Sequence, residues 1–243
     1  MIETYQQEKI DLAAALRLAA RFDLNEGIAN HFSFAVDEDG ERFLVNPHGI
    51  HWSQLRASDI LVANRHGEVL DGDGEAERSA ICIHGQVHYL HPRARCVLHT
   101  HMPYATALTA IEDGRLEPVV QSALMFYDEV AYDDEYGGLA FSEDEGQRIA
   151  DALGDKRVLF MANHGVMVVG KTIAQAFCDL YFLERACRVQ VLAMSTGRPL
   201  KLVGHNRAAS TFEPDWRDES VYGETHSAAL KRVLDAEDPS YAA

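Results

Sequence analysis

The sequence has few cysteines and no spacing that would pair them. Its 243 residues contain only four, Cys82, Cys96, Cys178 and Cys187, with no CxxC motif, and each lies in an apolar or helical segment. A disulfide framework and a cysteine-based metal site are therefore not expected. We predict buried, reduced thiols in a cytoplasmic protein. A catalytic cysteine is left open, although none has an obvious activating neighbour.

Long apolar runs and excess basic charge are also missing. No window approaches the ~20 apolar residues that span a bilayer, and charges are spread through residues 1–24, where a signal peptide would have an apolar centre. With 38 acidic and 22 basic residues, the net charge of −16 repels phosphate backbones and anionic lipid. We therefore expect neither nucleic acid nor a membrane as a partner.

No Pro/Ser/Gly-rich stretch or charge block divides the middle of the chain, and its hydrophobic content of 47% is ordinary for a globular protein. We predict one domain over residues 1–200, followed by a tail over residues 201–243. The tail contains Trp216 and Tyr222. It is too aromatic for a disordered segment, so we expect it to pack on its own domain or on a neighbouring subunit.

Hydrophobic periodicity predicts a layered α/β fold, because helical and extended segments alternate along the chain. The Asp39-Gly40 pair favours a hairpin between the first two extended segments. We expect helices at 5–24, 77–90, 104–111, 143–153 and 173–195, and strands at 31–36, 42–46, 60–64, 95–98, 158–161 and 166–169.

Three histidines form a candidate metal site. His99 and His101 follow directly after the strand predicted at 95–98, and the alternation of an extended chain sends both imidazoles to one side. His164 follows another apolar run and precedes Gly165, so the chain can turn it into the same pocket. Three imidazoles with an open position suit a catalytic divalent ion, with Zn²⁺ first and Mn²⁺, Fe²⁺ or Co²⁺ as alternatives. An HxH pair alone also occurs as buried, hydrogen-bonding residues.

Four other histidines have open roles. His84 and His88 are four residues apart on one face of a predicted helix, so they could form a second ligand pair. Hydrogen bonding to the HxH strand is the alternative that we favour. His31 and His51 follow two loops that contain glycine and asparagine, and they are weak candidates for substrate contact.

Several motifs in the same order resemble the class II aldolase/adducin family. The resemblance runs from about residue 8 to about residue 197. Its motifs are Asn30-His31-Phe32-Ser33, Val45-Asn46-Pro47-His48-Gly49-Ile50, His84, the segment from His91 to His101, and Asn163-His164-Gly165-Val166.

The resemblance implies a three-layer αβα sandwich with a mostly antiparallel central sheet, assembled as a homotetramer with sites at subunit interfaces. It also implies that His99, His101 and His164 match the three metal-binding histidines of the family. Members include sugar-phosphate aldolases, an epimerase, a dehydratase, aromatic-acid decarboxylases and the metal-free adducins. The fold alone does not choose among these activities.

The acid/base residue of the sugar-phosphate aldolases is missing. Their helix before the HxH strand opens with Ser-Ser-Glu, whose Glu ligates the resting metal and exchanges protons with the substrate. The aligned position here is Ala80. Glu75 or Glu77 could turn into the pocket from the start of the helix, or both could be solvated acids favoured by the helix dipole. We predict Glu77 and His84 as candidate catalytic residues.

The phosphate-binding residues of the family are also altered. Asn30 and Gly49 remain, and Ser79 is kept as a substrate-binding candidate, but His48 and Arg78 replace small hydroxyl residues. A guanidinium can grip both oxygens of a planar carboxylate, so the changes favour a carboxylate over a phosphate. The alternative is that Arg78 pairs with a surface acid and that His48 only packs.

These observations predict a metal-dependent lyase. We expect it to cleave a C–C bond of a small, non-phosphorylated hydroxy, oxo or aromatic carboxylate, by decarboxylation or retro-aldol cleavage, through a metal-stabilised enolate. Two alternatives are an iron-dependent oxygenase on the same scaffold and a non-catalytic binding protein of the adducin type.

Overall fold

The computed structural model describes residues 5–212 and 219–243, and eight strands in this part form one sheet. The strands are β1 (His31–Ala35), β2 (Arg42–Val45), β3 (Leu61–Asn64), β4 (Val69–Asp71), β5 (Cys96–Thr100), β6 (Val130–Asp133), β7 (Val158–Met161) and β8 (Gly165–Gly170). The helices are α1 (Gln6–Arg21), α2 (Arg78–Leu90), α3 (Pro103–Thr109), α4 (Gln121–Leu124), α5 (Glu143–Leu153), α6 (Ile173–Met194), α7 (His205–Thr211) and α8 (Glu219–Glu237).

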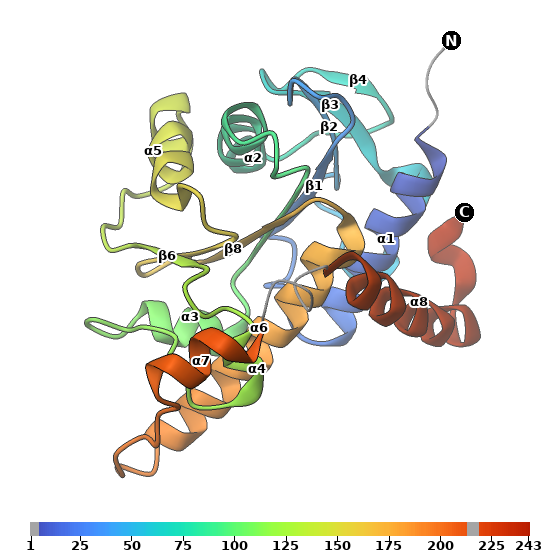
Figure 1. The fold of residues 1–243 in the computed structure, drawn as a ribbon. Coiled ribbons are helices and arrows are strands. Elements are labelled where there is room, and N and C mark those ends of the chain that lie inside the picture. Colours follow the sequence, from blue (N-terminus) through green and yellow to red (C-terminus); the bar gives the residue numbers. More distant parts are fainter. Residues whose placement is uncertain (1–4, 213–218) are drawn as a thin grey trace.

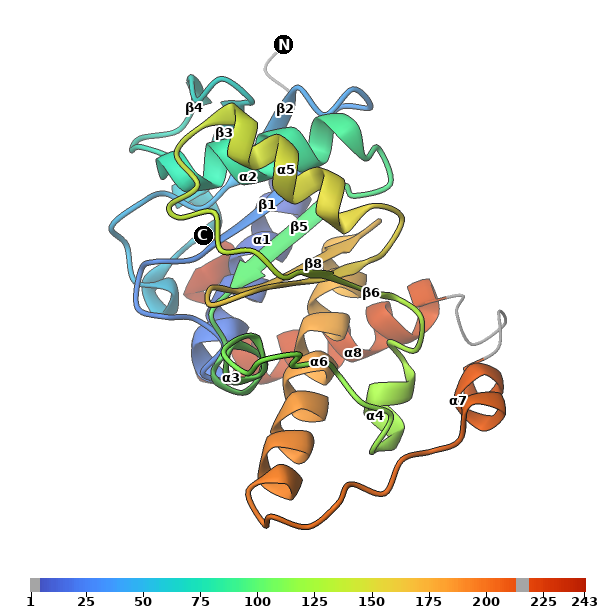
Figure 2. The same cartoon turned by 90° about the vertical axis from the view of Figure 1, so that its left-hand side faces the viewer.

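The sheet has the strand order β4-β3-β2-β1-β5-β8-β7-β6. Neighbouring strands are antiparallel throughout except β6 and β7, which are parallel. β5 therefore lies near the middle of the sheet, between β1 and β8. Figure 1 labels β1 and β8, and Figure 2 labels all three strands. The mostly antiparallel central sheet predicted from the sequence is confirmed.

Helices cover both faces of the sheet. Successive side chains of each strand point to opposite faces, so they pack against different helices. On β5, Cys96 and Leu98 join the apolar cluster that includes α1 and α6, whereas Val97 joins the cluster of α2 and α5. Figure 2 shows α2 and α5 on one side of the strands and α1 and α6 on the other. The predicted three-layer αβα arrangement is thus present.

The hairpin between β1 and β2 presses against α2. Gly40 in its turn has φ +68°, a conformation that side chains rarely adopt, and a Cβ there would lie 2.3 Å from the carbonyl oxygen of His88. Only glycine lets the hairpin approach this end of α2. The Asp39-Gly40 hairpin expected from the sequence is confirmed by the pairing of β1 with β2.

The structure corrects several element boundaries. β4, β6 and α4 were not expected, because elements of three or four residues are too short for a periodic signal. The helices α7 and α8 were also not expected, since the sequence predicted only a packed tail over residues 201–243. β5 runs to Thr100, so His99 lies within the strand instead of after it. α2 begins at Arg78, which leaves Glu77 in extended backbone at the N-cap position.

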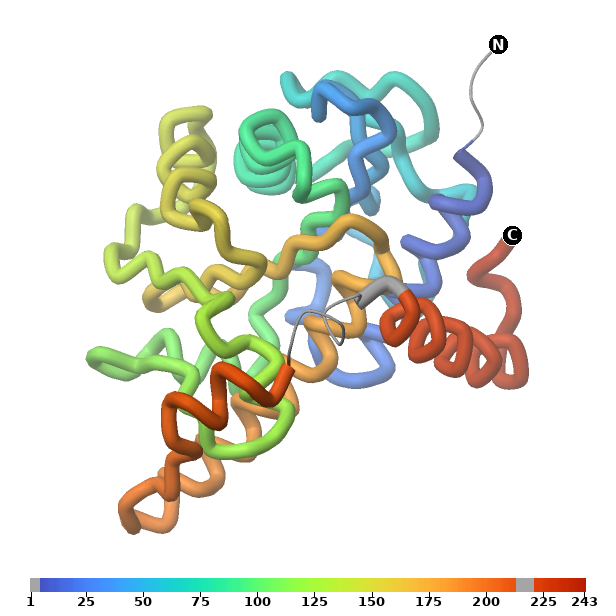
Figure 3. Tube along the Cα trace, in the orientation of Figure 1, coloured from blue at the N-terminus to red at the C-terminus, as the bar shows by residue number. Residues whose placement is uncertain are grey.

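The C-terminal segment packs on the same chain. α8 contacts α6 and α1, and Figure 3 shows the red C-terminal helix beside the blue N-terminal one. Tyr241 is buried in the same core cluster as Leu12 and Leu16 of α1. Trp216 lies outside the described residues, and the division of the chain at residue 200 stays a prediction.

Arg17 of α1 ties this segment down. Its buried guanidinium donates to the carbonyl oxygen of Leu55 at 2.7 Å, to Asp238 at 2.8 Å and to Ser240 at 3.0 Å. Arg21, one turn later, pairs with Glu237 on the surface. Both arginines therefore pair with an acid near the end of α8, Arg17 from a buried position and Arg21 on the surface.

Among the described residues, no helix combines the length and the apolar character needed to cross a membrane. The four cysteines are unpaired, as predicted. Cys96, Cys178 and Cys187 are buried, whereas Cys82 is only partly buried.

We predict that Arg17→Ala lowers the free energy of unfolding by about 2–3 kcal/mol, because the buried carbonyl of Leu55 loses its donor. The matched variant Arg21→Ala removes an exposed ion pair and should cost less than about 1 kcal/mol. Urea denaturation of both variants measures the difference. Equal losses would show that the Arg17 contacts do not stabilise the fold.

Candidate metal centre

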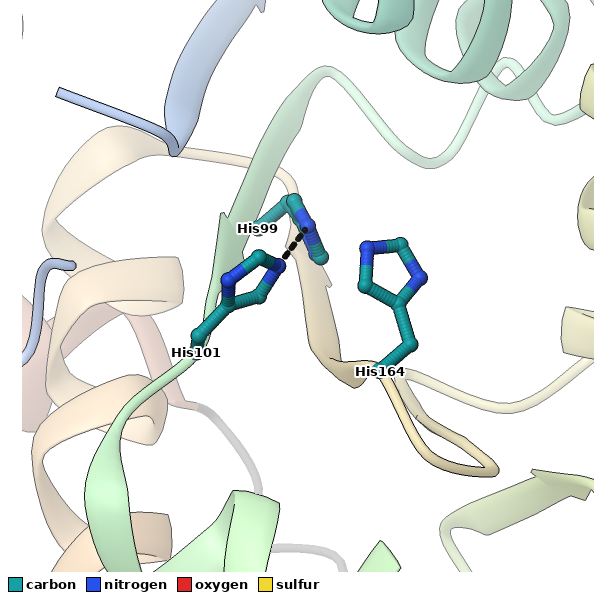
Figure 4. Close-up of side chains that lie close together, drawn as sticks. All are labelled: His99, His101 and His164. Carbon is teal, nitrogen blue, oxygen red and sulfur yellow. Dashed lines mark hydrogen bonds between the residues drawn. The ribbon is translucent and has the colours of Figure 1, made fainter. Parts of the chain in front are cut away.

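Three imidazoles converge at the end of β5. His99 lies in that strand, His101 directly follows it, and His164 stands in the turn between β7 and β8. One ring nitrogen from each lies within 4.8 Å of the other two. Figure 4 shows the three rings turned toward one another. The structure thus brings together the three histidines that the sequence singled out.

Gly165 makes this convergence possible. β8 begins at Gly165, and a Cβ there would lie 2.5 Å from the carbonyl oxygen of Thr100 and 2.7 Å from Cδ2 of His101. Any side chain would push the turn that carries His164 away from the HxH strand. The His-Gly pair is therefore a packing requirement of the cluster.

Backbone and carboxylate partners fix the tautomers of two rings. Nδ1 of His99 lies 3.0 Å from the carbonyl oxygen of Val166, which can only accept, so this nitrogen carries the proton. Nδ1 of His101 likewise donates to the Glu26 carboxylate at 2.5 Å. Each ring then has a lone pair on Nε2. In the neutral form of both rings, which is the form that binds a metal, these two Nε2 atoms face each other at 3.2 Å with no proton between them.

A divalent cation resolves this arrangement. Imidazole nitrogens bind zinc at about 2.0–2.1 Å, so two of them around one ion are separated by about 2.9–3.4 Å. The 3.2 Å between the two Nε2 atoms lies within this range. The Val166 carbonyl and the Glu26 carboxylate are partners of the kind that orient histidines in metal sites. The residues present therefore fit a divalent ion.

Burial favours the neutral form of His99 and His164. Burial, with the neighbouring imidazoles adding to it, holds the pKa of His99 well below its ordinary value. Burial and His101 lower the pKa of His164 to about 4, although Glu145 and Asp133 partly oppose the shift. Neutral imidazole is the form that binds metal.

Asn30 and Glu184 position the chain around His101. The side-chain oxygen of Asn30 accepts from the backbone nitrogen of Glu26 at 2.7 Å and from that of His101 at 3.4 Å. Glu184 of α6 accepts from the first backbone nitrogens of α3, at Tyr104 and Ala105. Burial raises the pKa of Glu184 to about 7. Asn30, a substrate-binding candidate, has its side-chain oxygen engaged in holding the loop.

His84 and His88 do not join the three-histidine cluster. Both are buried on α2, and Ser33 of β1 lies between them, 2.5 Å from Nδ1 of His84 and 2.7 Å from Nε2 of His88. His84 also lies 2.7 Å from Nδ1 of His31. The ring nitrogens of both histidines are thus hydrogen-bonded, as favoured over a second ligand pair. Their partners belong to β1 and to Ala94 instead of the HxH strand, so the predicted partner is wrong.

The remaining candidates lie in two places. The Ser79 hydroxyl lies 2.8 Å from a carboxylate oxygen of Glu77, and Glu77 lies 3.9 Å from His48, so these three side chains are grouped. Gly49 is exposed beside His48, with φ +86°. Arg78 turns away from this group, and its guanidinium lies 5.7 Å from the centre of the Phe141 ring.

The Arg78 side chain lines a separate cavity of about 400 Å³ together with Arg65, Cys82 and Phe141. Across the part of the chain that the structure describes, Arg78 forms no ion pair, so it is not held by a surface acid. His51 is exposed and hydrogen-bonded to Ser53 instead of reaching the cluster.

Two residues of the site were missed in the sequence. Glu26 has no metal-site signal in the sequence, because it is 75 positions from His101, which it contacts. Ser33 lies in a motif that was noted, but nothing in the sequence showed that it would stand between two histidines. Both contacts depend on strand register and loop path, which no local pattern contains.

Comparison with known proteins gives one family match. The family described as "Class II Aldolase and Adducin N-terminal domain" matches residues 10–191. A Caulobacter vibrioides protein named as an aldolase class 2 protein is 33% identical over 99% of this chain and 93% of its own length. "Decarboxylase NovR" of Streptomyces niveus is 28% identical over 97% of this chain and 90% of its own length.

Solved structures agree with this match. An aldolase II superfamily protein from Pseudomonas syringae superposes with a TM-score of 0.89 at 29% identity, covering 100% of this chain and 98% of the other. L-fuculose 1-phosphate aldolase from Glaciozyma antarctica PI12 superposes with a TM-score of 0.83 at 25% identity, covering 98% and 94%.

We predict that the purified protein binds about one divalent ion per chain and that His99→Ala or His101→Ala abolishes the binding. Glu26→Ala should weaken it by about 10–100-fold, because His101 loses the partner that orients it. Elemental mass spectrometry after dialysis measures the metal content, and zinc titration measures the affinity.

His51→Ala is the matched control, since His51 is exposed and outside the cluster. It should leave the metal content unchanged. Full metal occupancy in a His99→Ala/His101→Ala double variant would contradict the assignment.

Proposed function

The chain belongs to the class II aldolase and adducin family, and from this membership we propose that it is a divalent-metal-dependent lyase that cleaves a C–C bond of a small carboxylate. The observation that carries the proposal is the pair of Nε2 lone pairs that face each other at 3.2 Å beside His164. A binding protein without catalysis has no need for this arrangement.

We assign the metal to His99, His101 and His164, with zinc first and manganese, iron or cobalt as alternatives. The ion would supply Lewis acidity to oxygen atoms of the substrate and so draw in the electrons released by C–C cleavage. Val166 and Glu26 hold two of the rings in the tautomer that presents Nε2. The other roles belong to the chain's own side chains.

The acid/base role falls to Glu77. Position 80, where the sugar-phosphate aldolases have a glutamate, is a fully buried alanine. Glu77 is partly exposed at the N-cap of α2, and Ser79 links it to His31 beside the cluster. His84 is fully buried and has no route to a substrate, so we propose that it positions His31.

Carboxylate binding is supported by the residues around this acid. His48 stands 3.9 Å from Glu77, and Arg78, adjacent to Ser79 in sequence, has an exposed guanidinium without an ion pair among the described residues. We propose that Arg78 swings from the Phe141 ring to grip a substrate carboxylate and that Asn30, Gly49 and Ser79 shape the pocket. The similarity to a decarboxylase supports decarboxylation. The similarity to a fuculose-phosphate aldolase supports retro-aldol cleavage as the second candidate.

We further propose a homotetramer in the cytoplasm. The segment between β6 and α5 exposes Tyr136, Leu139 and Phe141, with Leu139 71% exposed, and such apolar surface is commonly covered by another subunit. The four unpaired thiols fit a reducing compartment.

We predict that the metal-loaded protein releases CO₂ or an aldehyde from a non-phosphorylated hydroxy, oxo or aromatic carboxylate faster than it cleaves any ketose phosphate. Arg78→Lys should then raise KM several-fold or more at unchanged metal content, because lysine keeps the charge but loses the two-pronged grip. A screen of carboxylates with coupled CO₂ and aldehyde assays measures both.

Arg65→Lys is the matched control, because Arg65 lines the same cavity but is paired with Glu41. Its KM should not change. Faster cleavage of a ketose phosphate, with kinetics that Arg78→Lys leaves untouched, would contradict the carboxylate role. Oxygen consumption with Fe²⁺ would identify an oxygenase instead.

The oligomer prediction is a particle of four 27.0 kDa chains at micromolar concentration. Light scattering coupled to size exclusion measures the mass. A monomer with full activity would show that neither assembly nor an interface residue is needed.

A further inference from the structure

A continuous hydrogen-bond chain runs from the rim of the site into the interior. It begins at Glu77, passes through Ser79, His31, His84, Ser33 and His88, and ends at the carbonyl oxygen of Ala94. From the rim inward its six contacts measure 2.8, 3.2, 2.7, 2.5, 2.7 and 2.7 Å. β1 and α2 supply most of its members. Two of its histidines are the i, i+4 pair that the sequence singled out.

The middle of this chain is sealed from water. His31, Ser33, His84 and His88 are each at most 2% exposed. Glu77 at the outer end has a side chain that is 28% exposed. Protons can therefore enter or leave the chain only at the Glu77 end.

The inner end fixes the direction of the hydrogen bonds. The Ala94 carbonyl can only accept, so His88 must donate from Nδ1 and, as a neutral ring, accept at Nε2. Ser33 then donates to His88 and accepts from Nδ1 of His84. The same order continues outward, so His31 donates inward from Nδ1 and presents an acceptor, Nε2, to Ser79.

The number of protons does not match the number of contacts. Six contacts each need one hydrogen, but three neutral histidines and two serines supply only five. The conflict appears at Ser79, whose single hydrogen is wanted by both His31 and an ionised Glu77. A proton on Glu77 completes the chain, because Glu77 then donates to Ser79 and Ser79 donates to His31. His48 lies 3.9 Å from Glu77, and Arg78 is adjacent to it in sequence.

We propose that this chain is a proton-delivery device: its fixed inner part makes Glu77 and Ser79 hold one transferable proton, which they give to the carbon left by C–C cleavage. The inference rests on the proposed lyase function. In decarboxylation the C–C bond breaks, CO₂ leaves, and the electron pair stays with the substrate carbon. That carbon takes the proton from the Glu77–Ser79 pair, and Glu77 ends as a carboxylate that regains a proton from solvent.

Neutron diffraction on a deuterium-exchanged crystal of the zinc-loaded protein tests the hydrogen positions along the hydrogen-bond chain without any substrate. We expect deuterium on Nδ1 and none on Nε2 of His31, His84 and His88. We expect the Ser79 deuterium to point to His31. Deuterium on Nε2 of His31 or His84 would show the opposite direction and overturn the proposal.

The variant Glu77→Gln separates delivery from a structural role. Its amide N–H supplies the sixth hydrogen permanently but cannot be transferred, so the melting temperature should not fall. On a carboxylate found by the screen, kcat should drop by about 10²-fold or more while KM changes little. Ser79→Ala should lower kcat similarly. Asp73→Asn, an exposed acid in the same loop, should leave melting temperature and kcat unchanged.

The outcomes distinguish the two proposals. A clear loss of melting temperature in Glu77→Gln, or an unchanged kcat, overturns the delivery chain while the lyase function stands. Failure of every carboxylate in the screen overturns the lyase function and with it the delivery role, whereas the hydrogen positions along the chain are judged by the neutron map alone.

Discussion

The antiparallel pairing of β1 with β5 is the constraint on which the site depends. It places His31 opposite His99 and Ser33 opposite Val97, so the polar side chains of both strands face α2. A slip of one residue would turn His31 and Ser33 into the layer of α1 and α6, where Phe32 and Phe34 now pack. One register thus sets the metal cluster and the buried hydrogen-bond chain together.

Burying so many imidazoles is expensive unless they stay neutral and hydrogen-bonded. The protein meets both conditions in the buried chain, where each ring nitrogen has a partner. In the metal cluster the partners are fewer, and two nitrogens are left facing each other. This difference separates histidines that organise the site from histidines that bind a ligand.

Local patterns predicted what depends on neighbours in sequence. The alternation in His99-Thr100-His101 correctly placed two rings on one side, and the i, i+4 spacing correctly placed His84 and His88 on one face of a helix. Contacts that depend on strand register or on the path of a loop could not be predicted from local sequence. Ser33 and Glu26 are the examples, since their partners lie 51 and 75 positions away.

The direction of Arg78 follows from the helix predicted at 77–90, although Arg78 and Ser79 were both predicted to bind the substrate. Position 78 begins α2, and its neighbour Ser79 faces His31, but one residue along a helix turns a side chain by about 100°. Arg78 therefore lies over Phe141 on the other side. The resemblance to the family drew attention to position 78, whereas helix geometry sets the orientation of its side chain.

The contacts of Arg17 with the C-terminal segment affect the order in which the chain folds during synthesis. Its partners Asp238 and Ser240 are 221 and 223 positions further along the chain. Until these residues have been synthesised, Arg17 has neither Asp238 nor Ser240 as a partner, and the core cluster lacks Tyr241. Closure of these contacts is therefore a late folding step, and folding of this chain is expected to be slow relative to a protein with local contacts.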